Sequence, residues 1–332
     1  MSRGEQLMVP EPEFESYYGR PIIKQPTWKS PDVPLYLFLG GLAGASAVLA
    51  EGAALTGRPG LERIGRYAAT SGAGLGTVFL IKDLGRPERF LKMLRVFKVT
   101  SPLSVGSYVL APFGTLTAVA VGSRITGWFP RLGRLAGLGS AALGPALATY
   151  TGALLANTAV PVWHEGHREL PVVFGASGAA AGGGLATLLA PAAESSPAVR
   201  MGVLGGAIEL AGSVGMEKRL GMLAEPYRQG KSGRLTQLSR ALTVGGLALT
   251  ALGTLTSASH DSRGAGGSAG RPGGALSSVA RRLGGAALVA GSLSLRFAVF
   301  EAGRASAKDP KYTVIPQRER AQARQKVPTR HE

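Results

Sequence analysis

The sequence predicts an all-α integral membrane protein with about eight transmembrane helices, and three observations lead to this prediction. Only 17% of its 332 residues are charged, against about 25% in an average soluble domain. Apolar runs recur along the chain at the length of roughly 20 residues that a membrane-spanning helix needs. The chain also contains 49 glycines, and small residues let helices pack closely in a bilayer, where lipid provides no hydrophobic drive for their association.

Apolar runs of spanning length follow one another between a polar N-terminal segment and a charged C-terminal segment. Residues 257–278 are rich in glycine and serine, which predicts a flexible polar loop. The charged, proline-bearing stretch from Lys308 onward predicts an extended or disordered tail. We expect the transmembrane helices at residues 34–56, 64–82, 103–123, 135–160, 170–192, 198–216, 238–258 and 280–303.

The chain is strongly basic, with a formal net charge of +17 at pH 7. In a soluble protein such a charge indicates binding to nucleic acid. Here the basic residues flank the apolar runs, and no basic groove with interleaved aromatic residues is present. We therefore expect the basic residues to contact membrane lipid, and we expect no nucleic-acid partner.

The location and orientation of the protein follow from its ends and loops. The first 30 residues lack the apolar core of a secretory signal peptide, so the first span is expected to act as an uncleaved insertion signal. With eight spans, both termini share a side with the loops after spans two, four and six. That side carries roughly twice as many basic residues as the other, which predicts cytoplasmic termini in the inner membrane.

Cysteine is absent and histidine occurs four times. Without cysteine the chain itself has no ligands for an iron–sulfur cluster and no attachment point for covalent haem. Because no histidine lies in a predicted span, we also expect no membrane-bound b-type haem. His164 and His167 are three residues apart with no third ligand in view, so we expect loop structure there and no metal site.

Charged side chains within predicted spans are costly and indicate function, and four of them are candidates here. They are Glu51, Glu209, Arg296 and Glu301, and we interpret them as a candidate proton pathway. An alternative for Arg296 is an ion pair with a carboxylate that fixes the helices together. Glu209 has no basic residue within a helical turn, so it is either a proton-carrying carboxylate or a buried acid with a distant partner.

Tyr150 and Thr151 bring hydroxyl groups into the otherwise apolar fourth span. A buried tyrosine hydroxyl requires a hydrogen-bond partner. One interpretation is a tyrosine of the aromatic belt at the membrane interface. The other is a donor to a quinone carbonyl, in an apolar pocket whose few polar groups fix the ligand's orientation.

The polar stretch DLGRPERFLKMLRVFKVTSPLSVGSY, residues 83–108, closely resembles a segment typical of the NrfD/PsrC family, the membrane subunits of polysulfide-reductase-type molybdoenzymes. Three other segments resemble the same family. They are PLYLFLGGLAGAS (34–46), YTGALLANT (150–158) and LRFAVFEAGRASAKDPKYT (295–313).

This resemblance implies eight helices in two four-helix bundles without haem. It divides the chain into an N-terminal segment, two bundles and a charged tail, at residues 1–33, 34–160, 161–303 and 304–332. It also implies a bound quinone, either menaquinone or ubiquinone. The expected partners are an iron–sulfur subunit with four clusters, of the ferredoxin-like kind, and a molybdopterin catalytic subunit.

The resemblance also transfers individual roles. Tyr150 matches the family's pocket tyrosine by its YTG context, with Thr151 beside it. The pocket residues before and within the first helix fall between Trp28 and Tyr36, where the Asn/His pair of the best-known relative is not evident. We expect the substitutes for that pair to be among Lys29, Asp32, Ser101 and Ser104. The residues expected to meet the iron–sulfur subunit, lipid headgroups or both are Arg86, Arg89 and Arg95.

Two other functions are compatible with the sequence. A stand-alone proton channel or small-solute transporter suits glycine-interrupted helices and buried carboxylates, although no internal repeat is visible. A purely structural anchor with an unused pocket is the third possibility. The substrate of the catalytic subunit and the direction of electron flow are not encoded in this chain.

Overall fold

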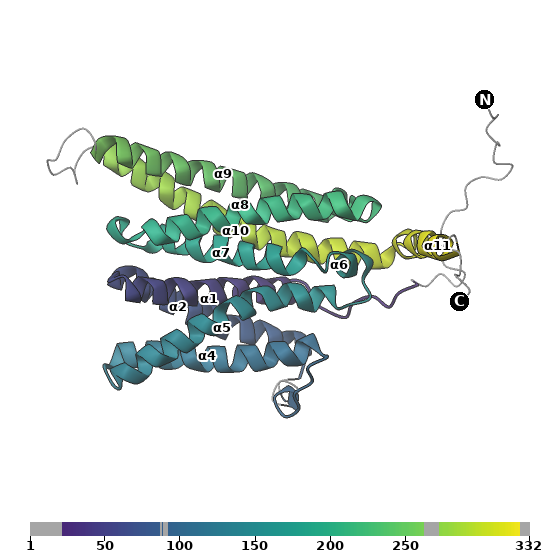
Figure 1. Cartoon of the computed structure of the whole chain (residues 1–332), viewed down its shortest axis with the longest axis horizontal. Helices are drawn as coiled ribbons and strands as arrows, with labels where there is room; N and C mark the ends of the chain where they lie inside the picture. Colours follow the sequence, from purple (N-terminus) through teal and green to yellow (C-terminus); the bar gives the residue numbers. More distant parts are fainter. Residues whose placement is uncertain (1–21, 87, 89–91, 262–271, 326–332) are drawn as a thin grey trace, which may run out of the picture.

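The computed structural model describes residues 22–86, 88, 92–261 and 272–325, and every regular element in these ranges is helical. The long helices lie side by side in one elongated body (Figure 1). Their bounds are α1 (Asp32–Leu55), α2 (Pro59–Leu84), α4 (Pro102–Thr126), α5 (Pro130–Ala156), α7 (Leu170–Leu189), α8 (Ser196–Leu220), α9 (Gly230–Asp261) and α10 (Pro272–Lys308). The predicted all-α fold is confirmed.

Six helices in the described part of the chain are long and apolar enough to cross a membrane: α1, α4, α5, α7, α9 and α10. The multi-pass membrane protein predicted from composition is therefore confirmed. α2 and α8 are as long, with 26 and 25 residues, but neither contains a stretch that is long, apolar and uncharged enough to be counted among the six. The count of eight membrane-spanning helices stays a prediction.

α1 lies at the centre of the packing. It contacts α2 and α5 on one side and α7 and α10 on the other, so its neighbours come from both halves of the chain. Glycines allow the close approach: a Cβ atom at Gly44 would overlap the carbonyl oxygen of Gly144 in α5. A Cβ atom at Gly178 in α7 would lie 2.8 Å from the carbonyl oxygen of Gly41. One apolar core therefore runs across the predicted boundary between residues 160 and 161.

Prolines and glycines set where the helices begin and end. Proline stands in the first turn of α2, α4, α5, α7 and α8, where no backbone donor is needed. Gly85 and Gly127 end α2 and α4 with φ angles of 69° and 72°, a left-handed conformation that favours glycine. These signals explain why the apolar runs turn back where they do.

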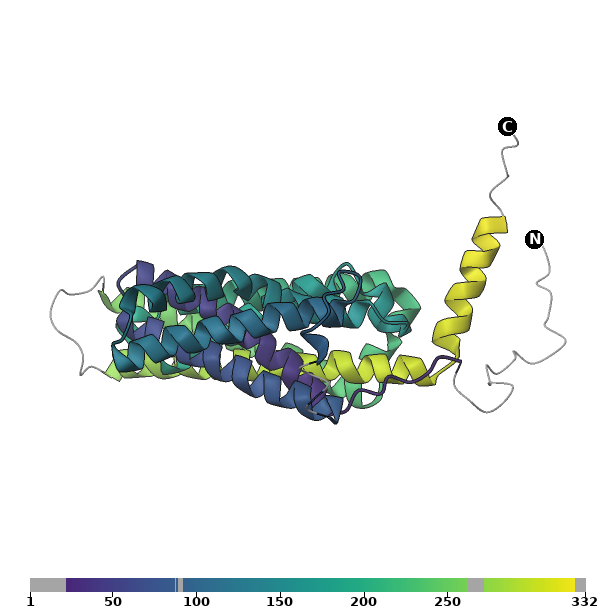
Figure 2. The ribbon, with the colours of Figure 1, turned by 90° about the horizontal axis from the view of Figure 1, so that it is seen from below.

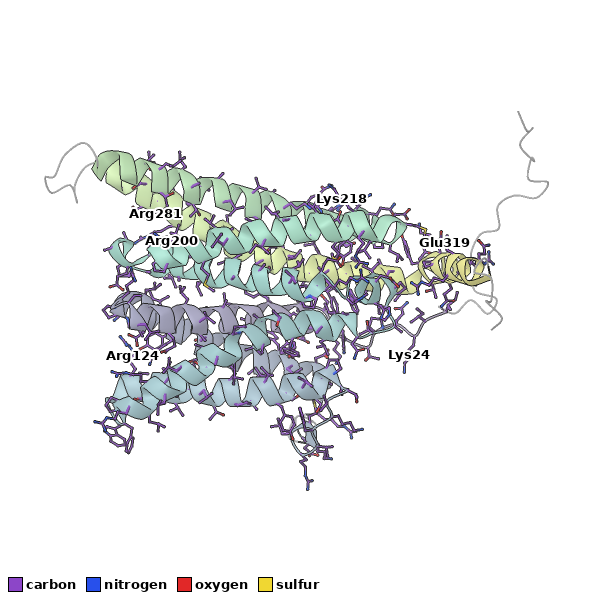
Figure 3. The ribbon with its side chains drawn as sticks, in the orientation of Figure 1. Lys24, Arg124, Arg200, Lys218, Arg281 and Glu319 are labelled. Carbon is purple, nitrogen blue, oxygen red and sulfur yellow. The ribbon has the colours of Figure 1, made fainter. Side chains whose placement is uncertain are left out.

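Long helices that follow one another in the chain run in opposite directions along the elongated body, which has two ends (Figures 1 and 2). We call the end that holds the start of α1 and the end of α10 the termini end, and the opposite one the far end. Three shorter elements lie at the termini end: α6 (Pro161–Glu165), η2 (Gly221–Tyr227) and α11 (Lys311–Gln325). η1 (Ala192–Glu194) lies between α7 and α8 at the far end. Figure 3 labels Lys24, Lys218 and Glu319 towards the termini end, and Arg124, Arg200 and Arg281 towards the far end.

Two sequence predictions about polar segments were wrong. The stretch after Lys308 was expected to be extended or disordered, but α11 is helical and stands nearly perpendicular to the bundle (Figure 2). Buried Tyr312 and Thr313 anchor it, and this tertiary contact overrides a weak local signal. The loop predicted at 257–278 is shorter, because α9 continues to Asp261 and α10 begins at Pro272. Residues 262–271, like 1–21 and 326–332, lie outside the described residues.

Candidate functional site

Buried hydroxyl groups without partners lie on α1 and α5, two of the first four long helices. Tyr36 of α1 and Thr151 of α5 are 3% and 0% exposed. Neither the Tyr36 hydroxyl nor Thr151 Oγ1 has a hydrogen-bond partner among the described residues. Buried polar groups are nearly always paired in folded proteins. Ser46 Oγ, also on α1, is a third orphan hydroxyl in this half of the bundle, and together they mark the region as a candidate ligand site.

Tyr150 lies directly beside Thr151 in α5 and packs against the same apolar core. Its ring rests on Gly106 of α4, where a Cβ atom would overlap Cε2 and Cζ of the ring and lie 2.8 Å from its hydroxyl oxygen. Thr151 similarly faces Gly40 of α1, with 3.7 Å between its Cγ2 and the position of a Cβ atom there. Glycines on two neighbouring helices thus make room for these two side chains.

Ser101 and Ser104 lie at the start of α4, and the backbone occupies both hydroxyls. Ser101 Oγ accepts a long hydrogen bond of 3.5 Å from the backbone N–H of Ser104, which is an N-cap. Ser104 Oγ accepts from the N–H of Lys98 at 3.0 Å and donates to the carbonyl of Val96 at 3.2 Å. In this arrangement the two serines shape the helix start.

Residues before α1 are tied to the neighbouring elements. Trp28 stacks on Trp163 of α6 with 5.7 Å between ring centroids. Asp32 pairs with Lys82 of α2 at 2.9 Å. The backbone N–H of Lys29 donates to Asp83 Oδ1 at 2.9 Å. These contacts fix the entry into α1, one turn before Tyr36.

The connection between α2 and α4 carries the arginines predicted to meet a partner. Arg86 and Arg95 are exposed at the termini end, and Arg89 lies outside the described residues. The segment is held by Tyr108 of α4, whose hydroxyl donates to the carbonyl of Leu94 at 2.8 Å. Phe97 packs on the same ring, with 4.8 Å between centroids.

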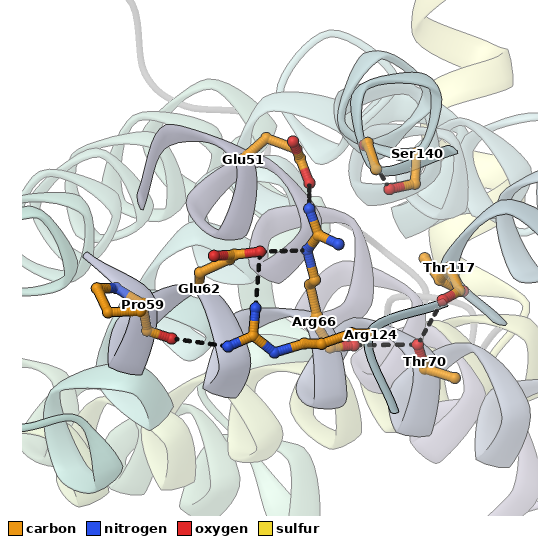
Figure 4. Close-up of polar contacts among 9 residues, drawn as sticks. Glu51, Pro59, Glu62, Arg66, Thr70, Thr117, Arg124 and Ser140 are labelled. Carbon is orange, nitrogen blue, oxygen red and sulfur yellow. Dashed lines mark hydrogen bonds and ion pairs between the residues drawn. The ribbon is translucent and has the colours of Figure 1, made fainter. Parts of the chain in front are cut away.

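Glu51 lies near the far end in a network of two acids and two arginines (Figure 4). Arg66 of α2 forms salt bridges with Glu51 at 2.8 Å and with Glu62 at 3.1 Å. Glu62 forms another with Arg124 of α4 at 3.0 Å. The network joins α1, α2 and α4. Sequence reasoning did not identify either arginine as a partner of Glu51, because helix register decides which residues meet.

Arg296 and Glu209 form a second buried polar group, in the middle of the other half. Arg296 is fully buried and donates to the carbonyl of Phe174 at 2.8 Å, while its guanidinium lies 3.8 Å from the centroid of the Phe174 ring. Glu209 accepts from Thr243 Oγ1 at 3.1 Å and interacts electrostatically with Arg296. Glu301, the nearer acid in sequence, pairs instead with Lys231 at 3.1 Å.

A polar route leads from Glu209 towards the termini end. Glu209, Ser213 and Glu217 repeat at four-residue spacing and form one buried stripe along α8. Glu217 pairs with Arg240 of α9 and, at 3.7 Å, with Arg228, whose side chain is 60% exposed. The buried atoms without a partner here are Glu209 Oε2, Ser213 Oγ, Tyr227 OH, Arg240 Nε and Arg296 Nη1. Clustered unsatisfied groups beside a small cavity are the setting in which buried water is found.

Sequence reasoning identified Glu209 but not the route. The four-residue repeat on α8 was visible in the sequence and is the signal that identifies Ser213 and Glu217 as neighbours. Tyr227 and Arg240 come from η2 and α9, and no local pattern places them beside α8.

Extramembrane ion pairs hold the termini end together. The Lys311 ammonium, hydrogen-bonded to Glu225 at 2.6 Å, lowers the pKa of the Glu225 carboxyl below its usual value. The hydrogen bond from Arg219 likewise lowers the pKa of Glu169. In the described part of the chain no three His, Cys, Asp or Glu residues gather as a metal site would require.

Comparison with known proteins gives one family. The sequence profile described as "Polysulphide reductase, NrfD" matches residues 24–199, more than half of the chain, from before α1 into the start of α8. This range includes the segments 83–108 and 150–158 that carried the resemblance. A comparison with curated proteins gave no match. The candidate site around Tyr36, Tyr150 and Thr151 lies inside the matched range, and the chain belongs to the polysulphide reductase NrfD family.

Proposed function

We propose that this chain is the quinone-binding membrane subunit of a molybdopterin oxidoreductase complex of the inner membrane, with its termini end facing the cytoplasm. Membership of the NrfD family implies a membrane subunit of a respiratory oxidoreductase complex, and such subunits generally work with iron–sulfur and molybdopterin subunits. A chain without cysteine needs another subunit to supply iron–sulfur clusters. Exposed Arg86 and Arg95 offer that partner a basic contact at the termini end.

The observation that carries the quinone assignment is the pair of orphan hydroxyls on Tyr36 and Thr151. Both are hydrogen-bond donors, and the carbonyls of a quinone ring are acceptors. A buried donor without a partner costs stability, and a ligand that accepts from it removes this cost. Tyr150, next to Thr151, supplies a third hydroxyl. The residues present therefore fit a quinone, which when bound provides two-electron, two-proton chemistry.

Removing these hydroxyls should weaken quinone binding. We expect Tyr150→Phe and Thr151→Val each to lower quinone affinity about 2- to 10-fold, since one hydrogen bond contributes about 0.5–1.5 kcal/mol. The measurement is the quinone retained by the purified complex and its quinone-reduction rate in liposomes. Tyr67→Phe, on an exposed tyrosine of α2, is the matched control. Unchanged retention and rate in both site variants would show that the pocket lies elsewhere.

The polar route on α8 supports a second part of the proposal, that proton movement accompanies quinone chemistry. A contact near its inner end supports this, because Arg296 Nε lies 3.4 Å from the carbonyl oxygen of Leu37, the residue after Tyr36. Its outer end reaches exposed Arg228 through Glu217. A two-electron quinone reduction takes up two protons, and this route offers acids and orphan polar groups for them.

Neutralising the inner acid should uncouple protons from electrons. In liposomes containing the complete complex, we expect Glu209→Gln to lower the number of protons moved per electron while quinone reduction continues. The readout is a pH-sensitive dye recorded together with quinone reduction. Glu319→Gln, on exposed α11, removes a carboxyl outside the route and should leave the ratio unchanged. An unchanged ratio in Glu209→Gln would remove Glu209 from the proton pathway.

The same route favours one alternative, a proton channel that acts alone. The two functions differ in what the isolated chain does. A channel conducts protons in liposomes without any partner or quinone, whereas the proposed subunit gives passive flux no higher than empty liposomes.

A further inference from the structure

A large open cavity lies at the termini end, between the start of α9 and the end of α10. Its volume is about 400 Å³, within the range of roughly 300–1,000 Å³ typical of small-ligand pockets. It is separate from the candidate quinone site and from the polar route on α8. Its lining residues are Pro226, Gln229, Gly230, Lys231, Ser232, Glu301, Arg304, Ala305, Lys308, Asp309 and Tyr312.

The lining has more positive than negative charge, with three cations against two carboxylates. Both carboxylates are already engaged. Glu301 is held by Lys231 at 3.1 Å and lies 3.9 Å from Arg304. Asp309 Oδ1 accepts the backbone N–H of Lys311 at 3.0 Å. Lys308 lies one turn after Arg304 on α10 and is exposed, so its ammonium and the loosely held Arg304 are available to an anion.

The cavity lies at the level of the membrane where lipid headgroups are expected. The apolar runs nearest to it cover residues 238–258 and 280–303, and the lining residues lie at or just beyond their ends. The first turn of α9, Gly230 to Ser232, contributes to the wall, and a helix N-terminus favours negative charge. Exposed Leu238 lies two turns deeper on the same helix, where acyl chains run.

We propose that this cavity binds the phosphate group of an anionic phospholipid. Lys231, Arg304 and Lys308 would give it charge-assisted hydrogen bonds, which are the strong kind. Basic pockets between transmembrane helices recognise acidic headgroups in this way. A zwitterionic lipid brings its own cation beside these three and is disfavoured. Inorganic phosphate carries the same anionic group as the lipid, but it has no acyl chain to hold it at this level of the membrane.

The test uses the full chain, purified in detergent and stripped of lipid. It is titrated with phosphatidylglycerol, phosphatidylcholine or inorganic phosphate, and bound molecules are counted by native mass spectrometry. We expect one phosphatidylglycerol to bind in preference to phosphatidylcholine. The double variant Arg304→Gln/Lys308→Gln should bind it roughly tenfold more weakly. Glu301→Gln, which removes a negative charge from the lining, should bind it more tightly.

A matched control removes two exposed charges outside the cavity, in Lys218→Gln/Arg282→Gln. Its affinity for phosphatidylglycerol should equal that of the unmodified chain. Circular dichroism of each variant checks that the helices are retained. Equal weakening in both double variants, or equal binding of phosphatidylcholine, overturns the proposal. Displacement of phosphatidylglycerol by stoichiometric inorganic phosphate overturns the lipid assignment and identifies a soluble anion as the ligand.

Discussion

Arg296→Met should lower the free energy of unfolding by about 1–3 kcal/mol, because it leaves the buried carbonyl of Phe174 without its hydrogen-bond donor and removes a positive charge that interacts with Glu209. Methionine retains much of the volume but loses the guanidinium, which donates to the carbonyl of Phe174 and interacts electrostatically with Glu209. Glu209 is then left as a buried carboxylate supported only by neutral groups. Denaturant unfolding in detergent, followed by circular dichroism, measures the loss.

Two further variants identify the cause. Arg282→Met changes an exposed arginine on the same helix and should shift stability by no more than about 0.5 kcal/mol. The double variant Arg296→Met/Glu209→Gln should recover part of the loss, because it also removes the uncompensated charge. If the double variant is as unstable as Arg296→Met alone, the cost comes from packing and the electrostatic account is wrong.

Gly106→Ala should displace the Tyr150 ring and strongly reduce quinone reduction by the complex. The new methyl group occupies the space of two ring carbons, and overpacking of this kind costs about 1–3 kcal/mol. The tyrosine hydroxyl remains in the chain but moves. Gly106→Ala therefore tests the position of the Tyr150 ring, whereas Tyr150→Phe tests the hydrogen bond from its hydroxyl. Quinone retained by the complex and the reduction rate are again the measurements.

Gly114→Ala, two turns further along α4, is the matched control because no atom lies within 4 Å of a Cβ atom there. Both alanines raise helix propensity equally, so any difference between the variants reports on Tyr150. Full quinone reduction in Gly106→Ala would mean that the Tyr150 ring does not position the quinone.

Much of the fold was predictable because long apolar runs have few alternatives in a bilayer. The first span, expected at 34–56, is α1 at Asp32–Leu55, and the fourth, expected at 135–160, overlaps α5 at Pro130–Ala156 and extends four residues beyond its end. The errors fell outside these runs. α11 is held by the packing of buried Tyr312 and Thr313, and local composition does not report such contacts.

The candidate site was predictable only in part. The YTG context pointed to Tyr150 and Thr151, and the structure puts Thr151 and Tyr36 in one apolar core. The partners of the charged residues were not predictable. Glu51 pairs with Arg66 across α1 and α2, and Glu209 of α8 interacts electrostatically with Arg296 of α10. Such pairs depend on the rotation and register of whole helices, which glycine contacts fix and residue spacing does not record.

The central position of α1 has a consequence for how the protein is made. Among the described long helices α1 is synthesised before the others, yet its neighbours include α5, α7 and α10, which are synthesised much later. Its surface of glycine and alanine is shaped for those helices and gives lipid little to pack against. During synthesis α1 must therefore wait in the bilayer, or beside an insertion factor, until the second half of the chain arrives. Translation that stops before α7 would leave it exposed to quality-control proteases.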